Sequence, residues 1–173
     1  PAIKKEWDEK KYLRTFYEWL LKNNISVGIA DKAFKMWKNK SIEILTANPY
    51  RLVELRGIGF VTADRLAHQI LSDVPQNFRM KACIQFVLGD QLLESNLCVT
   101  YPNLKKHILV LLAECDKNLG KDVSVDSYIP LVSSTLKENL DVFAVIKDIE
   151  EQPSMIYIYL KKIWDQEQYI SNA

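Results

Sequence analysis

The sequence lacks a Gly-x-x-x-x-Gly-Lys-Ser/Thr loop, the segment with which many proteins cradle the phosphates of ATP. We therefore expect this chain not to hydrolyse ATP by that route. Cysteine and histidine are also scarce, and Cys83, Cys98, Cys115, His68 and His107 show no spacing typical of zinc or redox sites. The sequence thus predicts no metal, no catalytic residue and three reduced thiols, as in a cytoplasmic protein.

Long apolar segments are missing as well. No run of about 18 or more apolar residues occurs, so no segment is predicted to span a membrane. The first residues show no basic-then-apolar leader. Because the chain begins with Pro1 rather than Met, we expect it to be a piece of a longer protein. Its 173 residues, 48% apolar and 26% charged, suit one globular domain or two small ones.

Net charge is only +1, but it is unevenly distributed along the chain. Residues 1–73 carry a net charge of +4, residues 74–120 carry +1, and residues 121–173 carry −4. A basic N-terminal part favours contact with nucleic acid there. Because the excess is mild, we expect modest affinity that falls as salt is added.

The stretch from residue 55 to residue 65 joins two predicted helices. The first helix, residues 41–48, ends before Pro49, because a residue that precedes proline avoids the α region. The second begins near Phe60, where apolar residues start to recur at helical spacing.

The two glycines in this stretch predict a phosphate-binding turn. Gly57 and Gly59 permit a tight turn around Ile58, whose side chain we expect to point inward. The backbone N–H groups of such a turn lie at a helix N-terminus, where the helix dipole favours anions. Arg56 and Arg65 add positive charge on either side. At Gly59, where we expect backbone to come nearest to phosphate, a side chain should strain the turn and block approach.

These residues resemble the helix-hairpin-helix motif of DNA-binding proteins. The matching positions are Leu55, Gly57, Ile58, Gly59, Thr62 and Ala63. The alternative interpretation of the same residues is a glycine C-cap between two core helices.

A wider segment resembles the N-terminal region of RecD-like DNA helicases, a family that includes the alpha subunit of exodeoxyribonuclease V. The resemblance rests on Asn-Pro-Tyr-Arg-Leu at 48–52, Gly-Ile-Gly-Phe at 57–60 and Thr-Ala-Asp-Arg-Leu-Ala at 62–67. It extends from about Trp7 to the C-terminus, where residues 157–160 and Glu167 are similar to the family's approach to its motor domain.

The resemblance implies a non-catalytic, DNA-binding accessory module of an ATP-dependent helicase in the bacterial cytoplasm, acting in DNA repair or recombination. Its DNA would be single-stranded or a junction, bound through phosphates without sequence preference. ATP and magnesium would serve only a motor domain in the same protein, beyond Ala173. The residues implied in DNA binding are Arg56, Gly57, Ile58, Gly59, Val61, Thr62, Arg65 and Lys32. The alternative function is a protein-interaction scaffold that docks the motor to a partner.

An internal repeat supports a tandem arrangement. A shift of 33 residues places Ala-Asp-Lys at 30–32 on Ala-Asp-Arg at 63–65, and Ile25 on Ile58. Asn24 and Ser26 then replace Gly57 and Gly59, and asparagine tolerates the left-handed region better than most residues. We expect this first hairpin to be mainly structural, with Lys22 and Lys32 at most assisting DNA binding.

The fold class predicted overall is mainly α: a tandem helix-hairpin-helix unit (1–73), a winged-helix-like helical unit with a small β-hairpin (74–160) and a connecting helix (161–173). In the first unit we expect a helix at 7–22 whose apolar face carries Leu13, Phe16, Tyr17, Leu20 and Leu21.

In the second unit we expect a helix at 76–95 that buries Phe78, Cys83, Phe86, Val87 and Leu93, followed by a short strand at 97–101 and a helix from Pro102 to near Gly120. A further helix should run from an Asp126 N-cap to Leu136, and two strands, 142–147 and 155–160, should flank a linker at 148–154.

Two further DNA-related readings are weaker. In a winged helix the recognition helix would span about 126–139, but it offers only Lys137 as a cation, so we interpret this half as a docking module. A DNA glycosylase would place a catalytic lysine near the hairpin and an aspartate about twenty residues later. Val61 and Arg79 stand at those positions, and no four-cysteine cluster pattern occurs.

Overall fold

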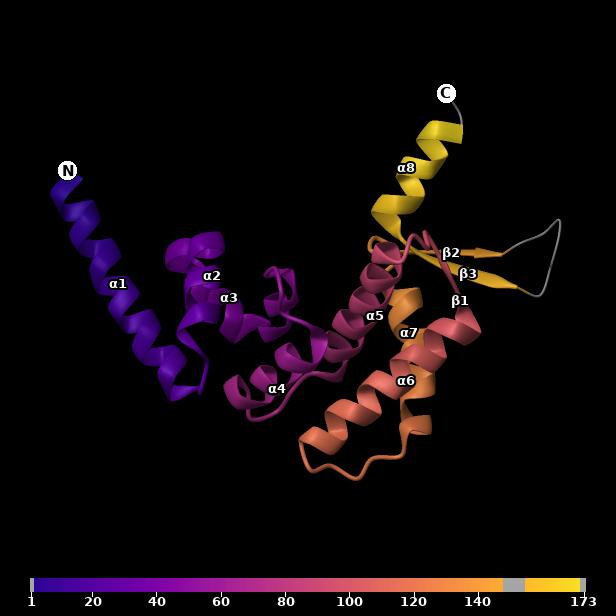
Figure 1. Ribbon diagram of the computed structural model, residues 1–173, viewed down its shortest axis with the longest axis horizontal. Helices are drawn as coiled ribbons and strands as arrows, with labels where there is room; N and C mark the ends of the chain where they lie inside the picture. The colour runs from indigo at the N-terminus through magenta and orange to yellow at the C-terminus, as the bar shows by residue number, and fades with distance from the viewer. Residues whose placement is uncertain (1, 148–154, 172–173) are drawn as a thin grey trace. The chain divides into compact units, whose positions relative to one another are not determined.

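The structure, a computed structural model, describes residues 2–147 and 155–171. The described part is mainly helical with one small antiparallel sheet (Figure 1), as the fold class predicted. The chain divides into two compact units, Pro1–Phe78 and Arg79–Ala173. As functional divisions, the three predicted segments 1–73, 74–160 and 161–173 stay predictions.

The first unit consists of short helices joined by tight turns. Its elements are α1 (Ala2–Lys22), α2 (Val27–Trp37), the 3₁₀ helix η1 (Lys38–Lys40), α3 (Ser41–Ala47), the 3₁₀ helix η2 (Pro49–Glu54), α4 (Phe60–Ile70) and the first residues of α5 (Gln76–Leu93). The helices predicted before Pro49 and from Phe60 are confirmed. Between them η2 was not predicted; it forms because Asn48 accepts a hydrogen bond from the Tyr50 backbone N–H at 3.1 Å and Pro49 has a fixed φ.

The core of the first unit collects apolar side chains from α1 to α4. Phe16 and Leu20 supply the α1 contribution, with at most 1% of each exposed. Leu21, predicted on the same apolar face, is 63% exposed, so that prediction is wrong. The buried stripe of α1 is centred on Phe16 and Leu20, one turn apart. Leu21 lies 100° further round the helix and faces away.

The second unit has the element order of a winged helix. After α5 come β1 (Val99–Thr100), α6 (Tyr101–Asn118), the 3₁₀ helix η3 (Val125–Tyr128), α7 (Ile129–Glu138), β2 (Phe143–Lys147), β3 (Ile156–Leu160) and α8 (Lys161–Ser171). The sheet order is β1-β3-β2, all antiparallel, with Ile158 opposite both Val99 and Val145. The predicted linker at 148–154 lies outside the described residues.

Two local predictions in this unit are wrong. Asp126 does not cap a helix: it lies inside η3, whose N-cap is Ser124, and α7 begins only at Ile129. Pro130 in the first turn of α7 explains the late start, because proline fits that position without losing a hydrogen bond. Leu93, expected to be buried, is 86% exposed at the end of α5, two residues before the left-handed Ser95 turns the chain.

A buried ion pair ties three elements of the second unit together. The Arg79 side chain on α5 is buried and donates to Asp116 Oδ1 on α6 and to the Tyr128 hydroxyl on η3, both at 2.9 Å. Tyr128 in turn donates to Asp116 Oδ2 at 2.7 Å. Burial, followed by the hydrogen bond to Asp116, raises the pKa of Tyr128. Each charged group therefore has a partner that offsets part of its desolvation.

Candidate nucleic-acid interface

The second hairpin has the predicted tight turn. Gly57 adopts φ +80°, a left-handed conformation that favours glycine, and the Ile58 side chain is 7% exposed, pointing inward as expected. Ile58 N–H donates to the Leu55 carbonyl at 3.0 Å, which closes the turn. Gly59 has φ −81° and ψ 168°, extended backbone that any residue adopts. The expectation that a side chain at Gly59 would strain the turn is therefore wrong for its backbone. Of the two glycines, only Gly57 has a backbone conformation that favours glycine.

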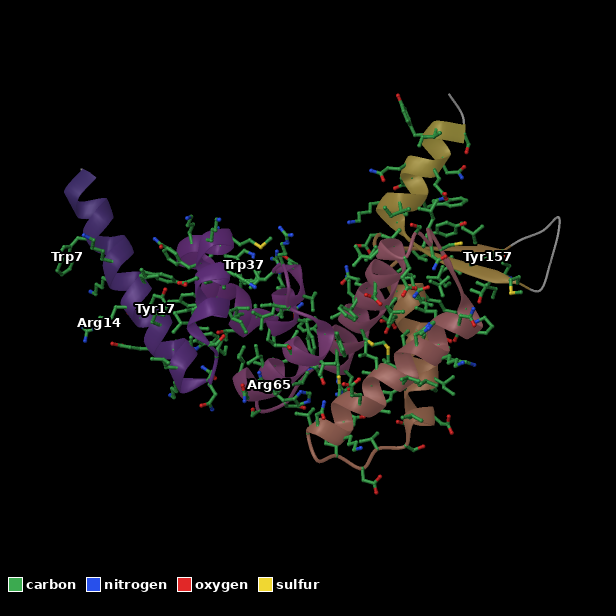
Figure 2. The ribbon with its side chains drawn as sticks, in the orientation of Figure 1. Trp7, Arg14, Tyr17, Trp37, Arg65 and Tyr157 are labelled. Atoms are coloured by element: carbon green, nitrogen blue, oxygen red, sulfur yellow. The ribbon has the colours of Figure 1, made fainter. Side chains whose placement is uncertain are left out.

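The turn leads directly into the N-terminus of α4. The N-cap residue is Gly59, which has no side chain to cap the first N–H groups of the helix. Arg56 on the turn and Arg65 on α4 are exposed, and Arg65 projects from the α4 ribbon in Figure 2. Val61 and Thr62 lie in the first turn of α4 and are half-buried. The geometry thus presents backbone donors with positive charge on both sides.

A buried hydrogen bond fixes α4 against η2, and sequence reasoning missed it. The Tyr50 hydroxyl donates to Asp64 Oδ1 at 2.5 Å, and both side chains are at most 2% exposed. The Tyr50 ring also stacks on Phe60, with centroids 5.9 Å apart. Asp64 precedes Arg65, so this bond fixes the part of α4 from which Arg65 projects.

The first hairpin repeats the backbone of the second. Asn24 adopts φ 53°, so it replaces Gly57 in the left-handed region, as predicted. Ser26 has φ −69° and ψ 151° at the N-cap of α2, close to the values of Gly59, and makes no side-chain cap. Ile25 is 2% exposed, like its buried counterpart Ile58. These shared conformations support the internal repeat.

The tyrosine–aspartate bond is repeated as well. On the first repeat the Tyr17 hydroxyl donates to Asp31, and this hydrogen bond raises the pKa of Tyr17. Tyr17 and Asp31 are separated by the same 14 residues as Tyr50 and Asp64. The first pair is exposed, however, whereas the second is buried. The signal that could have predicted Tyr50 was therefore present in the 33-residue repeat.

One predicted DNA-binding residue makes a contact that links the repeats. Lys32 Nζ on α2 donates to the Arg56 carbonyl at 2.9 Å, which joins the first repeat to the second hairpin. Next to this contact lies a groove, lined by Lys32, Lys35, Met36, Glu54, Leu55, Arg56 and Gly57. Thus the structure brings Lys32, Arg56 and Gly57 together. In the 33-residue repeat Lys32 is the counterpart of Arg65, yet its ammonium group donates to the backbone of the second hairpin.

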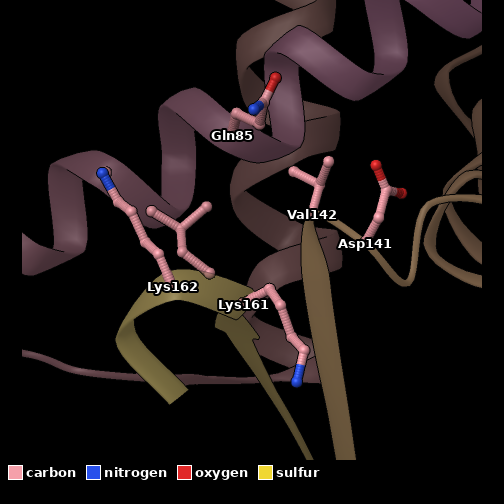
Figure 3. Close-up of a pocket in the computed structure, with 7 residues that line it drawn as sticks. Gln85, Asp141, Val142, Lys161 and Lys162 are labelled. Atoms are coloured by element: carbon pink, nitrogen blue, oxygen red, sulfur yellow. The ribbon is translucent and has the colours of Figure 1, made fainter. Parts of the chain in front are cut away.

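The second unit contains a separate depression, shown in Figure 3. It is lined by Gln85 and Gly89 of α5, Asp141 and Val142 before β2, Leu160 at the end of β3, and Lys161 and Lys162 at the start of α8. The two lysines point apart in Figure 3, and Lys161 Nζ donates to Asp165 at 2.6 Å. This depression therefore gathers less free positive charge than the hairpin groove.

Within residues 2–147 and 155–171, no three His, Cys, Asp or Glu side chains gather as a metal site would require. In the same ranges, no helix combines the length and apolar character needed to cross a bilayer.

Comparison with known proteins identifies the family. Residues 9–96, just over half of the chain, match the family model described as the ATP-dependent RecD2 DNA helicase HHH domain. The matched segment contains both hairpins and all of α5. A search of curated proteins by sequence found no match. With its two hairpins and this match, the chain belongs to the family of the RecD2 DNA helicase helix-hairpin-helix domain.

Proposed function

We propose that the first unit binds the phosphate backbone of DNA through its second hairpin, without sequence preference, as an accessory module of an ATP-dependent helicase. The observation that carries this proposal is the left-handed Gly57 turn, which leads into a helix whose N-cap, Gly59, has no side chain. Backbone N–H groups at a helix N-terminus are good donors to phosphate oxygens. The family to which the chain belongs supports the same ligand.

Side-chain charge supports phosphate over base contacts. Arg56 and Arg65 are exposed on either side of the turn, while Asp64, the nearby acid, is buried against Tyr50. Phosphate contacts position a protein on DNA but do not read its sequence. The expected DNA is single-stranded or a junction, and the module would act in repair or recombination.

In this proposal the chain contributes binding, and catalysis belongs elsewhere in the protein. ATP and magnesium would act in a helicase motor domain on the same polypeptide. The setting would be the bacterial cytoplasm. Among the described residues, no three His, Cys, Asp or Glu side chains gather as a metal-dependent reaction would require.

A docking role is proposed for the second unit. On α8, Tyr169 is 79% exposed and Ile170 is 74% exposed, and the helix has no buried residue. The helix in the position of a winged-helix recognition helix, α7, offers only Lys137 as a cation. The exposed Tyr169 and Ile170 suit a protein surface better than phosphate. The motor domain is the partner that fits this role.

The test measures DNA binding by the full chain with fluorescence anisotropy at several salt concentrations. Arg65→Ala should remove about one phosphate contact and lower the slope of log affinity against log salt by about 0.7 to 0.9 on every sequence. Lys137→Ala removes the same charge from α7 and should leave the slope unchanged. Circular dichroism should confirm that both variants are folded.

Two results would contradict the proposal. If Arg65→Ala binds like the parent while Lys137→Ala binds weakly, the DNA site lies in the second unit. If the full chain binds no DNA even at low salt, the scaffold function is favoured instead.

A further inference from the structure

The groove beside the second hairpin has an apolar floor. Leu55, only 4% exposed, forms its base, and Met36 on α2 lines it with 52% of its surface exposed. Methionine is flexible and polarisable, and its sulfur makes favourable contacts with aromatic rings. The exposed Met36 and the buried Leu55, which line the same groove, therefore provide a surface against which a flat aromatic group can pack.

The edge of the groove is positively charged. Lys32, Lys35 and Arg56 line it, and all three are exposed. The single acidic residue that lines the groove, Glu54, accepts two hydrogen bonds from Arg51, at 2.6 and 2.8 Å, so its charge is balanced. The groove thus combines an apolar floor with a cationic edge, which complements a ligand that is both flat and anionic.

We propose that this groove holds one unpaired nucleotide, with its base against Met36 and Leu55 and its phosphate beside Lys35. The inference rests on the proposed function, because Arg56 and Gly57 belong both to the groove and to the hairpin that binds phosphate. A strand held at the hairpin therefore continues directly into the groove. A paired base is stacked inside its duplex and does not reach the floor, so the groove selects single-stranded DNA next to a junction.

The test compares three DNAs with the full chain: a blunt duplex, the same duplex with single-stranded extensions, and the extended duplex with abasic extensions. The parent should bind the extended duplex most tightly. Met36→Ala should weaken binding to the extended duplex by about fivefold, the loss expected when one or two methylene-sized groups no longer contact a base. It should not change binding to the abasic or blunt duplex.

Matched variants separate the groove from general effects. Val110→Ala removes a similarly exposed apolar side chain from α6, 64% exposed, and should change nothing. Lys35→Ala should weaken binding to both extended duplexes, because phosphate remains when the base is absent. Lys106→Ala, which removes an exposed lysine from α6, should leave both unchanged.

The outcomes distinguish this inference from the proposed function. Equal loss by Met36→Ala on normal and abasic extensions, or no loss on either, would overturn the nucleotide site while Arg65→Ala still tests the hairpin. Loss with Met36→Ala but not with Arg65→Ala would support the groove and overturn the hairpin as the main phosphate site. If a glutamate-rich peptide displaced the extended duplex from the parent but not from Met36→Ala, the groove would be assigned to a protein partner instead.

Discussion

The first hairpin, residues 23–26, and the second hairpin, residues 56–59, have nearly the same backbone conformation at equivalent positions. Asn24 and Gly57 are both left-handed, and Ser26 and Gly59 are both extended N-caps. Asparagine therefore takes the place of the left-handed glycine in the first hairpin. Differences in ligand binding between the repeats must come from side chains around the turn.

Those side chains differ in a consistent direction. Next to the first hairpin, two apolar side chains are exposed: Leu21 at 63% and Val27 at 53%. Asp31 is exposed on α2, whereas its counterpart Asp64 is buried. Both aspartates accept a hydrogen bond from a tyrosine hydroxyl, but only the Asp31 carboxylate is exposed, where an approaching phosphate would meet it directly. Two turns of similar shape therefore differ in their side chains: one aspartate is buried only beside the second turn, and Leu21 and Val27 are exposed beside the first.

The largest difference in stability between the two repeats should appear when the aspartate of each tyrosine–aspartate pair is removed. Asp64→Ala leaves the buried Tyr50 hydroxyl without this acceptor and should lower the free energy of unfolding by about 1 to 3 kcal/mol. Asp31→Ala removes an exposed bond and should change it by less than about 0.5 kcal/mol. Urea unfolding followed by circular dichroism measures both. Equal losses would show that burial does not distinguish the repeats.

Gly57 and Gly59 should separate folding from binding. Gly57→Ala places a Cβ on a left-handed residue and should lower the free energy of unfolding by about 1 to 2 kcal/mol. Gly59→Val has an allowed φ, so we expect it to stay folded while its side chain blocks phosphate and weakens DNA binding strongly. Thermal unfolding and anisotropy on the same samples give both quantities. A Gly59→Val variant that binds DNA like the parent would contradict a close backbone approach at Gly59.

Lys32 should have a smaller effect than Arg65. Its ammonium group already donates to the Arg56 carbonyl, so Lys32→Ala should lower the free energy of unfolding by about 0.5 to 1 kcal/mol. The accompanying change in salt slope should be less than that of Arg65→Ala. Salt-dependent anisotropy on the two variants in parallel makes this comparison. An equal or larger slope change for Lys32→Ala would place a full phosphate contact on the first repeat.

The smallest effect should follow Asn24→Gly, which restores the motif's glycine to the first hairpin. Relief of the left-handed side chain and the greater freedom of glycine in the unfolded chain nearly cancel, so the free energy of unfolding should change by less than about 0.5 kcal/mol. DNA affinity should stay the same, because Asp31, Leu21 and Val27 still surround the turn. A clear gain in affinity by anisotropy would show that glycine alone controls binding.

The parts of the site that were predictable are those determined by neighbouring residues. Ile58 faces inward because it is the apolar residue between two glycines, and Asn24 is left-handed because asparagine tolerates that region. Helix starts at Phe60 and after Thr100 follow from apolar spacing and from Pro102. Such features need no information about distant parts of the chain.

Features that depend on distant residues were not predicted. Arg79 is separated from Asp116 by 37 residues and from Tyr128 by 49, so nothing local showed that its charge is buried. The contact between Lys32 and Arg56 spans 24 residues and was missed for the same reason. Exposure of Leu21 was also misjudged, because helical spacing gives the direction of a face but not the width of the buried stripe.

The buried position of Arg79 limits where the polypeptide can be cut. A fragment that starts at residue 80 would retain the buried Asp116 carboxylate without the guanidinium that neutralises it, a loss of about 3 to 5 kcal/mol when one partner of such a pair is removed. A fragment that starts at Gln76 keeps both the cation and the first turn of its helix. Proteases or gene fusions that separate the two units would therefore keep this ion pair only if they cut before Arg79.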